Sequence, residues 1–134
     1  MPFIKVYYND SLSDNETDLI SKSIHDSLMN NFEVPEDDIF HLFLPYKDKQ
    51  FVFNENYKLS VGKARTNKMI YVDILCGNGR SSLQKEKLFL SIATNISKSI
   101  EVNPADIFIT IKESSRENWS FGEGVAQLIE KGGI

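Results

Sequence analysis

The sequence predicts an α/β (α+β) fold in which two fused βαβ units form a four-stranded sheet with two helices on one face. The chain repeats itself, since Glu33–Phe40 (EVPEDDIF) returns as Glu101–Phe108 (EVNPADIF), a shift of 68 residues. Each half also has the pattern strand, helix, strand, and each helix carries one apolar stripe that must be buried on a sheet. We therefore expect a single domain over 1–134, with repeats at 1–66 and 67–134.

The strands are predicted from short runs rich in β-branched and aromatic residues. The first strands are expected at Phe3–Tyr8 and Met69–Cys76, and the second strands at Asp38–Leu44 and Asp106–Ile111. Parallel strands joined through a helix form a right-handed βαβ unit. Because strand side chains alternate, the helices can cover only one side of strands that are apolar on both. An uncovered apolar face usually packs on another subunit, so we expect an oligomer.

Each predicted helix begins at a capping box, in which a serine and a residue three positions later satisfy the first free backbone N–H groups. The two boxes are Ser13–Glu16 and Ser81–Gln84. Apolar residues then recur at helical spacing, namely Ile20, Ile24, Leu28 and Phe32 in the first helix and Leu88, Ile92, Ile96 and Ile100 in the second. These two stripes place both helices on the same face of the sheet.

Composition and charge disfavour several classes of protein. Hydrophobic residues make up 41% and charged residues 25% of the 134 residues, as in ordinary globular proteins. A net charge of −4 without a Lys/Arg cluster argues against nucleic acid or an anionic membrane as a partner. The single cysteine, Cys76, and the lack of a signal peptide or a long apolar run predict a cytoplasmic protein. Neither His25 nor His41 has further ligands at metal-binding spacing, so no metal and no cofactor is expected.

Three motifs give the chain a family resemblance. Pro2 leads straight from Met1 into a strand, Gly79–Lys85 makes a Gly-Arg-Ser turn into the second helix, and Glu117–Gln127 contains Asn-Trp-Ser-Phe-Gly. With these motifs the chain resembles the tautomerase superfamily and, within it, the double-length proteins around malonate semialdehyde decarboxylase. The resemblance implies a tautomerase-like homotrimer with active sites where the N-terminal strand meets its neighbours. It also implies that Pro2 becomes catalytic once Met1 is removed.

Pro2 is the centre of the chemistry that the resemblance implies. Removal of Met1 exposes a secondary amine, and an α-amino group titrates at about 7.7–8.0 in model peptides. An apolar pocket lowers the pKa of such an amine, so that it acts as a base, whereas nearby anions keep it protonated as an acid. Either state suits proton transfer on a small 2-keto or enol carboxylic acid of the phenylpyruvate type. A retained Met1 would make the Pro2 nitrogen an amide, without basicity.

Arg80 is the expected anchor for the substrate carboxylate, because a guanidinium can pair with both carboxylate oxygens. In the repeat register Arg80 corresponds to Leu12 and Pro2 to Ile70, so we expect one kind of site per chain. The decarboxylase pattern has a second arginine where this chain has Asn78, which supplies only neutral hydrogen bonds. This departure disfavours dicarboxylates and malonate semialdehyde, and it favours the enol of an aryl or alkyl pyruvate.

Three further candidate residues have both a functional and a structural interpretation. Asp38 matches an aspartate that, in the decarboxylase-like proteins, lies near the proline and orients substrate or activates water. Its repeat equivalent Asp106 belongs to a unit that has Ile70 in place of Pro2, which equally favours a role in shaping a turn. Trp119 and Phe121 are expected to bind substrate as an apolar wall that excludes water. Packing in the core or between subunits is the alternative for these two aromatic residues.

The sequence thus favours an enzyme of the tautomerase type, with Pro2 as acid or base and Arg80 as the anchor of a small carboxylate substrate. Two alternatives stay open. One is decarboxylation or hydration of a three-carbon acid such as malonate semialdehyde, in which a cationic Pro2 and Asp38 would cooperate. The other is a non-catalytic oligomeric binding module that keeps the fold.

Overall fold

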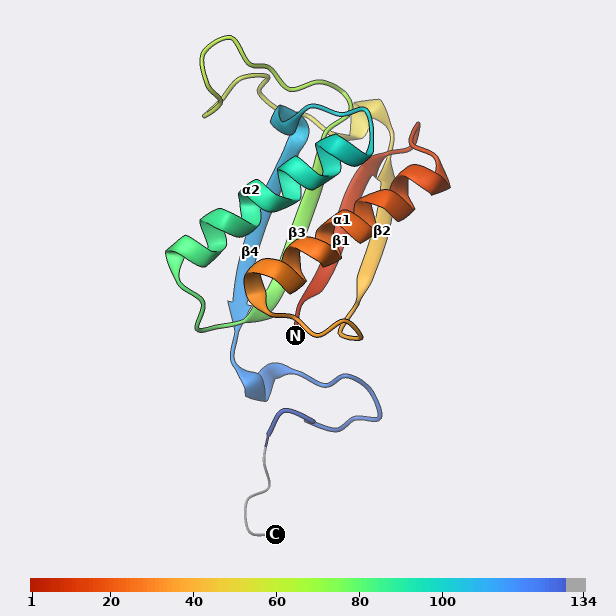
Figure 1. Ribbon diagram of the computed structural model, residues 1–134. Coiled ribbons are helices and arrows are strands. Elements are labelled where there is room, and N and C mark those ends of the chain that lie inside the picture. Colours follow the sequence, from red (N-terminus) through yellow and green to blue (C-terminus); the bar gives the residue numbers. More distant parts are fainter. Residues whose placement is uncertain (130–134) are drawn as a thin grey trace.

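The computed structural model describes residues 1–129, which form one mixed sheet and two long helices. The elements in chain order are β1 (Phe3–Asn9), α1 (Asp14–Phe32), β2 (His41–Tyr46), β3 (Ile70–Gly77), α2 (Ser82–Ser99) and β4 (Ile107–Ser114). Short 3-10 turns lie at Asp48–Gln50, Pro104–Asp106 and Arg116–Asn118. Figure 1 shows both helices lying across the same face of the sheet, which confirms the predicted fold class.

The strand order β2-β1-β3-β4 determines which ends of the chain meet. β1 runs parallel to β2 and β3 runs parallel to β4, whereas the central pair β1 and β3 is antiparallel, with Phe3 opposite Leu75. The start of β1 therefore lies beside the end of β3. Figure 1 shows that the N-terminus, the α1–β2 connection, the β3–α2 turn and the segment after β4 lie at this end of the sheet, and the long connection before β3 at the other.

The helices form where the sequence predicts them, and for the predicted reasons. The side chains of Ser13 and Ser81 each accept a hydrogen bond from the backbone N–H three residues on. The side chains of Glu16 and Gln84 accept in turn from the backbone N–H groups of Ser13 and Ser81. All eight residues of the two apolar stripes are buried against the sheet, together with the inward side chains Ile4, Val6, Ile70, Val72 and Ile74. Burial of these stripes holds both helices on the sheet.

The second strands begin later than the sequence predicts. β2 starts at His41 rather than Asp38, and β4 starts at Ile107 rather than Asp106. Both aspartates instead lie in turns, where the Asp38 N–H donates to Pro35 and the Asp106 N–H donates to Asn103. Their side chains bind the segments that lead into β1 and β3, and this long-range contact keeps them out of the strands.

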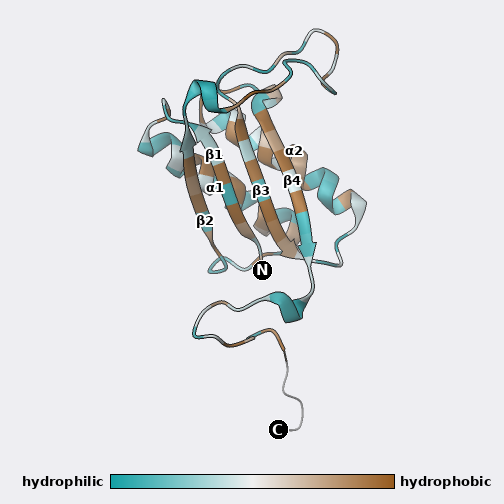
Figure 2. Ribbon diagram, turned by 180° about the vertical axis from the view of Figure 1, so that it is seen from behind, coloured by the Kyte–Doolittle hydropathy of each residue, from teal (hydrophilic) through white to brown (hydrophobic). Residues whose placement is uncertain are grey.

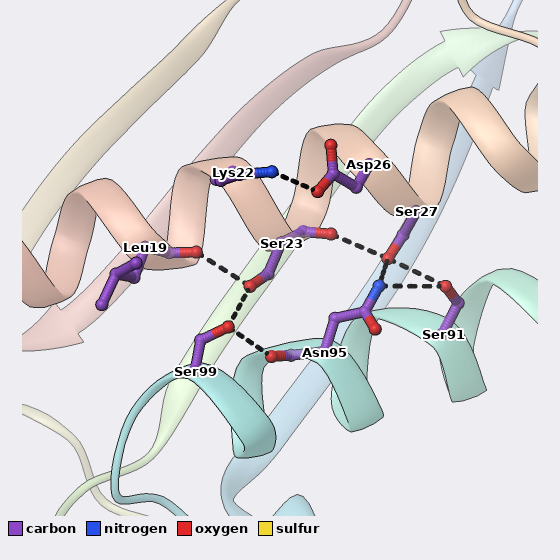
Figure 3. A network of polar contacts seen from close by, with 8 residues as sticks. All are labelled: Leu19, Lys22, Ser23, Asp26, Ser27, Ser91, Asn95 and Ser99. Atoms are coloured by element: carbon purple, nitrogen blue, oxygen red, sulfur yellow. Dashed lines mark hydrogen bonds and ion pairs between the residues drawn. The ribbon is translucent and has the colours of Figure 1, made fainter.

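A polar seam joins the two helices where their axes approach each other, as Figure 3 shows. We use the term for Ser23 and Ser27 of α1 together with Ser91, Asn95 and Ser99 of α2. Ser91 and Asn95 both donate to the buried Ser27 hydroxyl, at 2.9 and 3.0 Å, and the hydroxyls of Ser23 and Ser99 lie 3.1 Å apart. Directional hydrogen bonds, rather than apolar packing alone, therefore set the position of one helix along the other.

Figure 2 shows the sheet face opposite the helices, over which no described helix lies. Phe40, Leu42, Leu75 and Phe108 are between 39% and 47% exposed on or beside these strands. Tyr7 stacks on Tyr71 across the central strand pair. The oligomer predicted from the sequence would bury an apolar surface of this kind. Neither helix within residues 1–129 has the length and apolar character needed to cross a lipid bilayer.

Two histidines pack together between α1 and β2. His25 Nε2 donates to the Glu36 carbonyl at 2.8 Å, and His41 Nδ1 lies 2.8 Å from the Ser21 hydroxyl. The two imidazole rings meet edge to face with their centroids 5.9 Å apart. Burial, and secondly the neighbouring His25, lowers the pKa of His41 from 6.5 to about 4. The folded chain therefore holds His41 neutral at pH values where the unfolded chain protonates it.

Stability is expected to fall as the pH is lowered from about 6.5 to about 4. In this window the unfolded state binds a proton at His41 and the folded state does not, so each pH unit costs at most about 1.4 kcal/mol, and less because the ring is partly exposed. Urea unfolding between pH 7 and pH 4 should show a smaller loss for His41→Gln than for the wild type. Parallel curves for the two proteins would contradict this assignment.

Candidate active site

The residues that the sequence singles out meet at the end of the sheet where β1 begins. Because β1 and β3 are antiparallel, the chain before Phe3 runs back along the end of β3, so that Met1 reaches Gly77. The α1–β2 connection brings Asp38 to this end, and the turn after β3 brings Arg80. Two segments that lie far apart in the sequence thus come to the same end of the sheet as the start of the chain.

Met1 occupies the position next to Asp38. Its amino group donates a hydrogen bond to Asp38 Oδ2 and forms an ion pair with it, and both side chains are about four-fifths buried. Pro2 is buried directly behind Met1, and its nitrogen is part of the Met1–Pro2 peptide bond. The basic nitrogen beside Asp38 is therefore that of Met1. Consecutive α-carbons are about 3.8 Å apart, so the Pro2 nitrogen lies within a few ångströms of the same carboxylate.

Asp38 and its repeat equivalent Asp106 bind different groups. Asp106 is 1% exposed, and its two carboxylate oxygens accept from the Thr66 backbone N–H at 2.6 Å and from the Thr66 hydroxyl at 2.7 Å. Asp106 thus fixes the segment that enters β3. Asp38 has an amino group where Asp106 has a backbone amide and a hydroxyl. Within residues 1–129 the duplicated aspartate is hydrogen-bonded to an amino group in only one of the two repeats.

Arg80 lies across the C-terminal end of α1. Its guanidinium carbon is 4.4 Å from the centre of the Phe32 ring, and its Nη atoms donate long 3.3 Å hydrogen bonds to the Gly77 and Phe32 carbonyls. A cation at this end also complements the helix dipole. Among residues 1–129 no carboxylate lies within salt-bridge distance of Arg80. The guanidinium is held in place by a ring and two carbonyls, and it keeps N–H groups for an anion.

Asn78 and the two aromatic candidates belong to segments that lie at the same end of the sheet. Asn78 is exposed, in the turn two residues before Arg80. Trp119 stacks on Phe121 at 5.8 Å, Phe121 meets Phe40 at 6.1 Å, and Phe40 stacks on Phe3 at 6.4 Å. The segment after β4 thus returns to the start of β1 through a row of aromatic rings. The Trp119 indole nitrogen is buried without a hydrogen-bond partner within residues 1–129.

Two hollows within residues 1–129 lie away from this convergence. One, of about 640 Å³, is polar and surrounds Asp106 and Thr66 at the opposite end of the sheet. Another, of about 430 Å³, is apolar and lies between the 51–57 segment, Tyr71 and Phe108. Neither is lined by Pro2, Asp38 or Arg80. At their end of the sheet, the Met1 side chain packs against Gly77 instead.

Cys76, the residue before Gly77 in β3, lies beside this site. It is 1% exposed, and burial raises the pKa of its thiol although the nearby Arg80 acts in the opposite direction. A buried cysteine of this kind packs as a small apolar residue.

Sequence reasoning missed three residues around the site. Phe32 was expected only as part of a helix stripe and Phe40 only as part of a strand, yet they contact Arg80 and Phe121. No sequence pattern indicates a role for Gly77. The antiparallel register of β1 and β3 would have pointed to it, because that register sets Gly77 beside the start of the chain.

Comparisons with known proteins agree with this architecture. A sequence family described as "Tautomerase enzyme" matches residues 38–122. "Probable tautomerase YusQ" of Bacillus subtilis (strain 168) is 35% identical over 130 residues, which cover 97% of this chain and all of that protein. "Probable tautomerase YrdN" of the same organism is 21% identical over 105 residues, 78% of each chain.

Solved structures share the same double-length fold. FG41 malonate semialdehyde decarboxylase, inhibited by 3-bromopropiolate, superposes with a TM-score of 0.85 at 24% identity, over 93% of this chain and 92% of that one. Native fused 4-OT superposes with a TM-score of 0.76 at 11% identity, over 93% and 96%. From the family match, the relative that spans nearly its whole length and this fold, the chain belongs to the tautomerase superfamily, in its double-length form.

Proposed function

We propose that the protein is a cofactor-independent tautomerase that moves a proton within a small 2-keto or enol carboxylic acid, such as an aryl or alkyl pyruvate. The observation that carries this proposal is the contact of the first amino group with Asp38, at the end of the sheet to which Arg80 also comes. In the active form Met1 has been removed, and Pro2 supplies the secondary amine at this place.

The arrangement suits an interconversion of enol and keto forms. Arg80 pairs with the substrate carboxylate, because its guanidinium has N–H groups to spare and no carboxylate partner among residues 1–129. In ketonisation the C2=C3 electron pair forms a new bond from C3 to a proton, the enol hydroxyl loses its proton, and the C2–O bond becomes a carbonyl. Pro2 donates the proton to C3 and regains one from the hydroxyl, so the enzyme ends unchanged.

The aromatic row supplies the apolar side of the site. Trp119 and Phe121 reach Phe40 and Phe3 beside Pro2, and they limit the access of water to the amine. We also propose that the chain forms a homotrimer through the uncovered sheet face. Two fused 4-OT structures with the same fold are described as a symmetric and an asymmetric trimer.

The test begins with the intact mass of the purified protein, which should correspond to the chain without Met1. The ketonisation of phenylenolpyruvate, followed by ultraviolet absorbance, should then proceed far above the uncatalysed rate. A protein that retains Met1 and leaves this rate unchanged would refute the proposal and favour a binding module.

Decarboxylation or hydration of a three-carbon acid is the second candidate function. The contact between Asp38 and the terminal amino group favours it, because an anion beside the amine stabilises the cationic form that such chemistry uses. Two structures with a TM-score of 0.85 are described as malonate semialdehyde decarboxylases, one of them with hydratase activity. Release of carbon dioxide from malonate semialdehyde faster than ketonisation would favour this reaction.

Replacement of Asp38 by asparagine is expected to move the pH–rate profile. Loss of the anion removes an interaction that favours the protonated amine, so the limb that reports the Pro2 amine should move to lower pH. Asp106→Asn is the matched control, because it alters the equivalent carboxylate at the other end of the sheet. The control should lower the melting temperature without moving the limb, and an unmoved limb in Asp38→Asn would exclude the proposed contact.

A further inference from the structure

The backbone fold does not explain why Gly77, the last residue of β3, is a glycine. Its backbone lies outside the left-handed region, since the glycines with positive φ are Gly62, Gly79, Gly122 and Gly124. A β-carbon built on Gly77 would overlap the Met1 Cε and lie 3.6 Å from the Met1 Sδ. Among residues 1–129 it would meet no other atom within 4 Å beyond its chain neighbours. Neither backbone conformation nor core packing requires glycine here, and only the space that the Met1 side chain fills does.

This space, which we name the Met1 niche, lies between two residues that bind charged groups of the site. At one side the Met1 amino group binds Asp38. At the other side Gly77, whose surface the Met1 thioether covers, accepts a hydrogen bond through its carbonyl from Arg80 at 3.3 Å. An unbranched side chain thus extends from an amine over a residue that has no side chain and whose carbonyl binds a guanidinium.

We infer that the Met1 niche receives the carbon chain of the substrate once Met1 has been removed, and that Gly77 determines substrate length. The inference rests on the proposed function and narrows its substrate class. Met1 itself shows the shape that fits, which is a linear apolar chain of four heavy atoms ending against Gly77. The substrate class is therefore a 2-keto monocarboxylate with a linear apolar side chain, its carboxylate on Arg80 and its C3 next to the Pro2 amine.

Wild-type protein of verified mass tests this inference without any substitution. Exchange of the C3 protons for deuterium in D₂O, followed by NMR, reports the proton transfer directly. The value of kcat/KM should rise along pyruvate, 2-oxobutanoate, 2-oxopentanoate and 2-oxohexanoate, because each added methylene is buried, and it should fall for the branched 3-methyl-2-oxobutanoate. A series without dependence on length would overturn the inference.

Gly77→Ala tests the residue itself. The added methyl group should lower kcat/KM for 2-oxohexanoate about ten-fold or more relative to pyruvate, the usual effect of one methyl group in a tight apolar site. The melting temperature should stay near that of the wild type, because the methyl group meets no other part of the protein. An unchanged ratio between the two substrates would refute the role of Gly77 and leave the proposed function standing. Wild-type protein that exchanges neither substrate would refute both.

Discussion

Pro2→Ala is expected to lower kcat/KM for ketonisation by roughly 10²-fold. The variant still exposes an amine after Met1 is removed, but a primary amine on a freely rotating bond replaces one held by a buried ring. General acid–base catalysis contributes about 10²–10⁴-fold when the group is positioned, and position is what this substitution removes. Initial rates with phenylenolpyruvate, on protein whose mass confirms the new N-terminus, provide the measurement.

A second form of the protein separates the amine from the ring. An uncleaved extension ahead of Pro2 keeps the ring but makes its nitrogen an amide, so the whole contribution of the amine, about 10²–10⁴-fold, should be lost. Circular dichroism should show the same helix content in the wild type, in Pro2→Ala and in the extended protein. Full activity of the extended chain would remove the Pro2 nitrogen from the mechanism.

Arg80→Gln is expected to have the second largest effect, mainly on KM. A charge-assisted hydrogen bond contributes about 1.5–3 kcal/mol, so loss of the guanidinium should lower kcat/KM by roughly 10–10²-fold. Arg80→Lys should recover part of this loss, because it restores the charge without the fork of donors. Steady-state kinetics with a 2-keto acid, together with the melting temperature, distinguish binding from folding.

The structural contacts of Arg80 require a control that loses similar contacts elsewhere. Arg65 donates to the Asn54 and Tyr57 carbonyls at 3.0 and 2.7 Å, at the other end of the sheet. Arg65→Gln removes an arginine that holds backbone carbonyls, as Arg80→Gln does, but it should leave KM unchanged. If both variants lower the melting temperature and neither raises KM, Arg80 only stabilises the end of α1.

The fold could be predicted because its signals are local or repeated. A capping box, a helical stripe and a shift of 68 residues are visible in the sequence, and each reappears in the structure. The predicted starts of β2 and β4 are wrong because Asp38 and Asp106 bind chain segments that lie 37 and 40 residues away in the sequence. No local pattern reports a contact of that range.

The site could be predicted only in part. The resemblance selects Pro2, Arg80 and Asp38, and these residues do lie at one end of the sheet. The contact of Phe40 with Phe121 and the role of Gly77 depend on the antiparallel pairing of β1 with β3, which brings the two repeats together head to tail. The pattern within each repeat predicts the structure of that repeat alone. Residues whose contacts depend on how the two repeats pair therefore could not be predicted.

The polar seam has a consequence for the chemistry at the end of the sheet. Phe32 is the last residue of α1, and Arg80 comes two residues before the first residue of α2, so the distance between ring and guanidinium depends on how far one helix is shifted along the other. A seam of leucines could bind the helices as tightly, yet it would tolerate small axial displacements that hydroxyl and amide pairs do not. The serines of the polar seam, near the middle of the helices, thus help to fix the position of the Arg80 guanidinium at the end of the sheet.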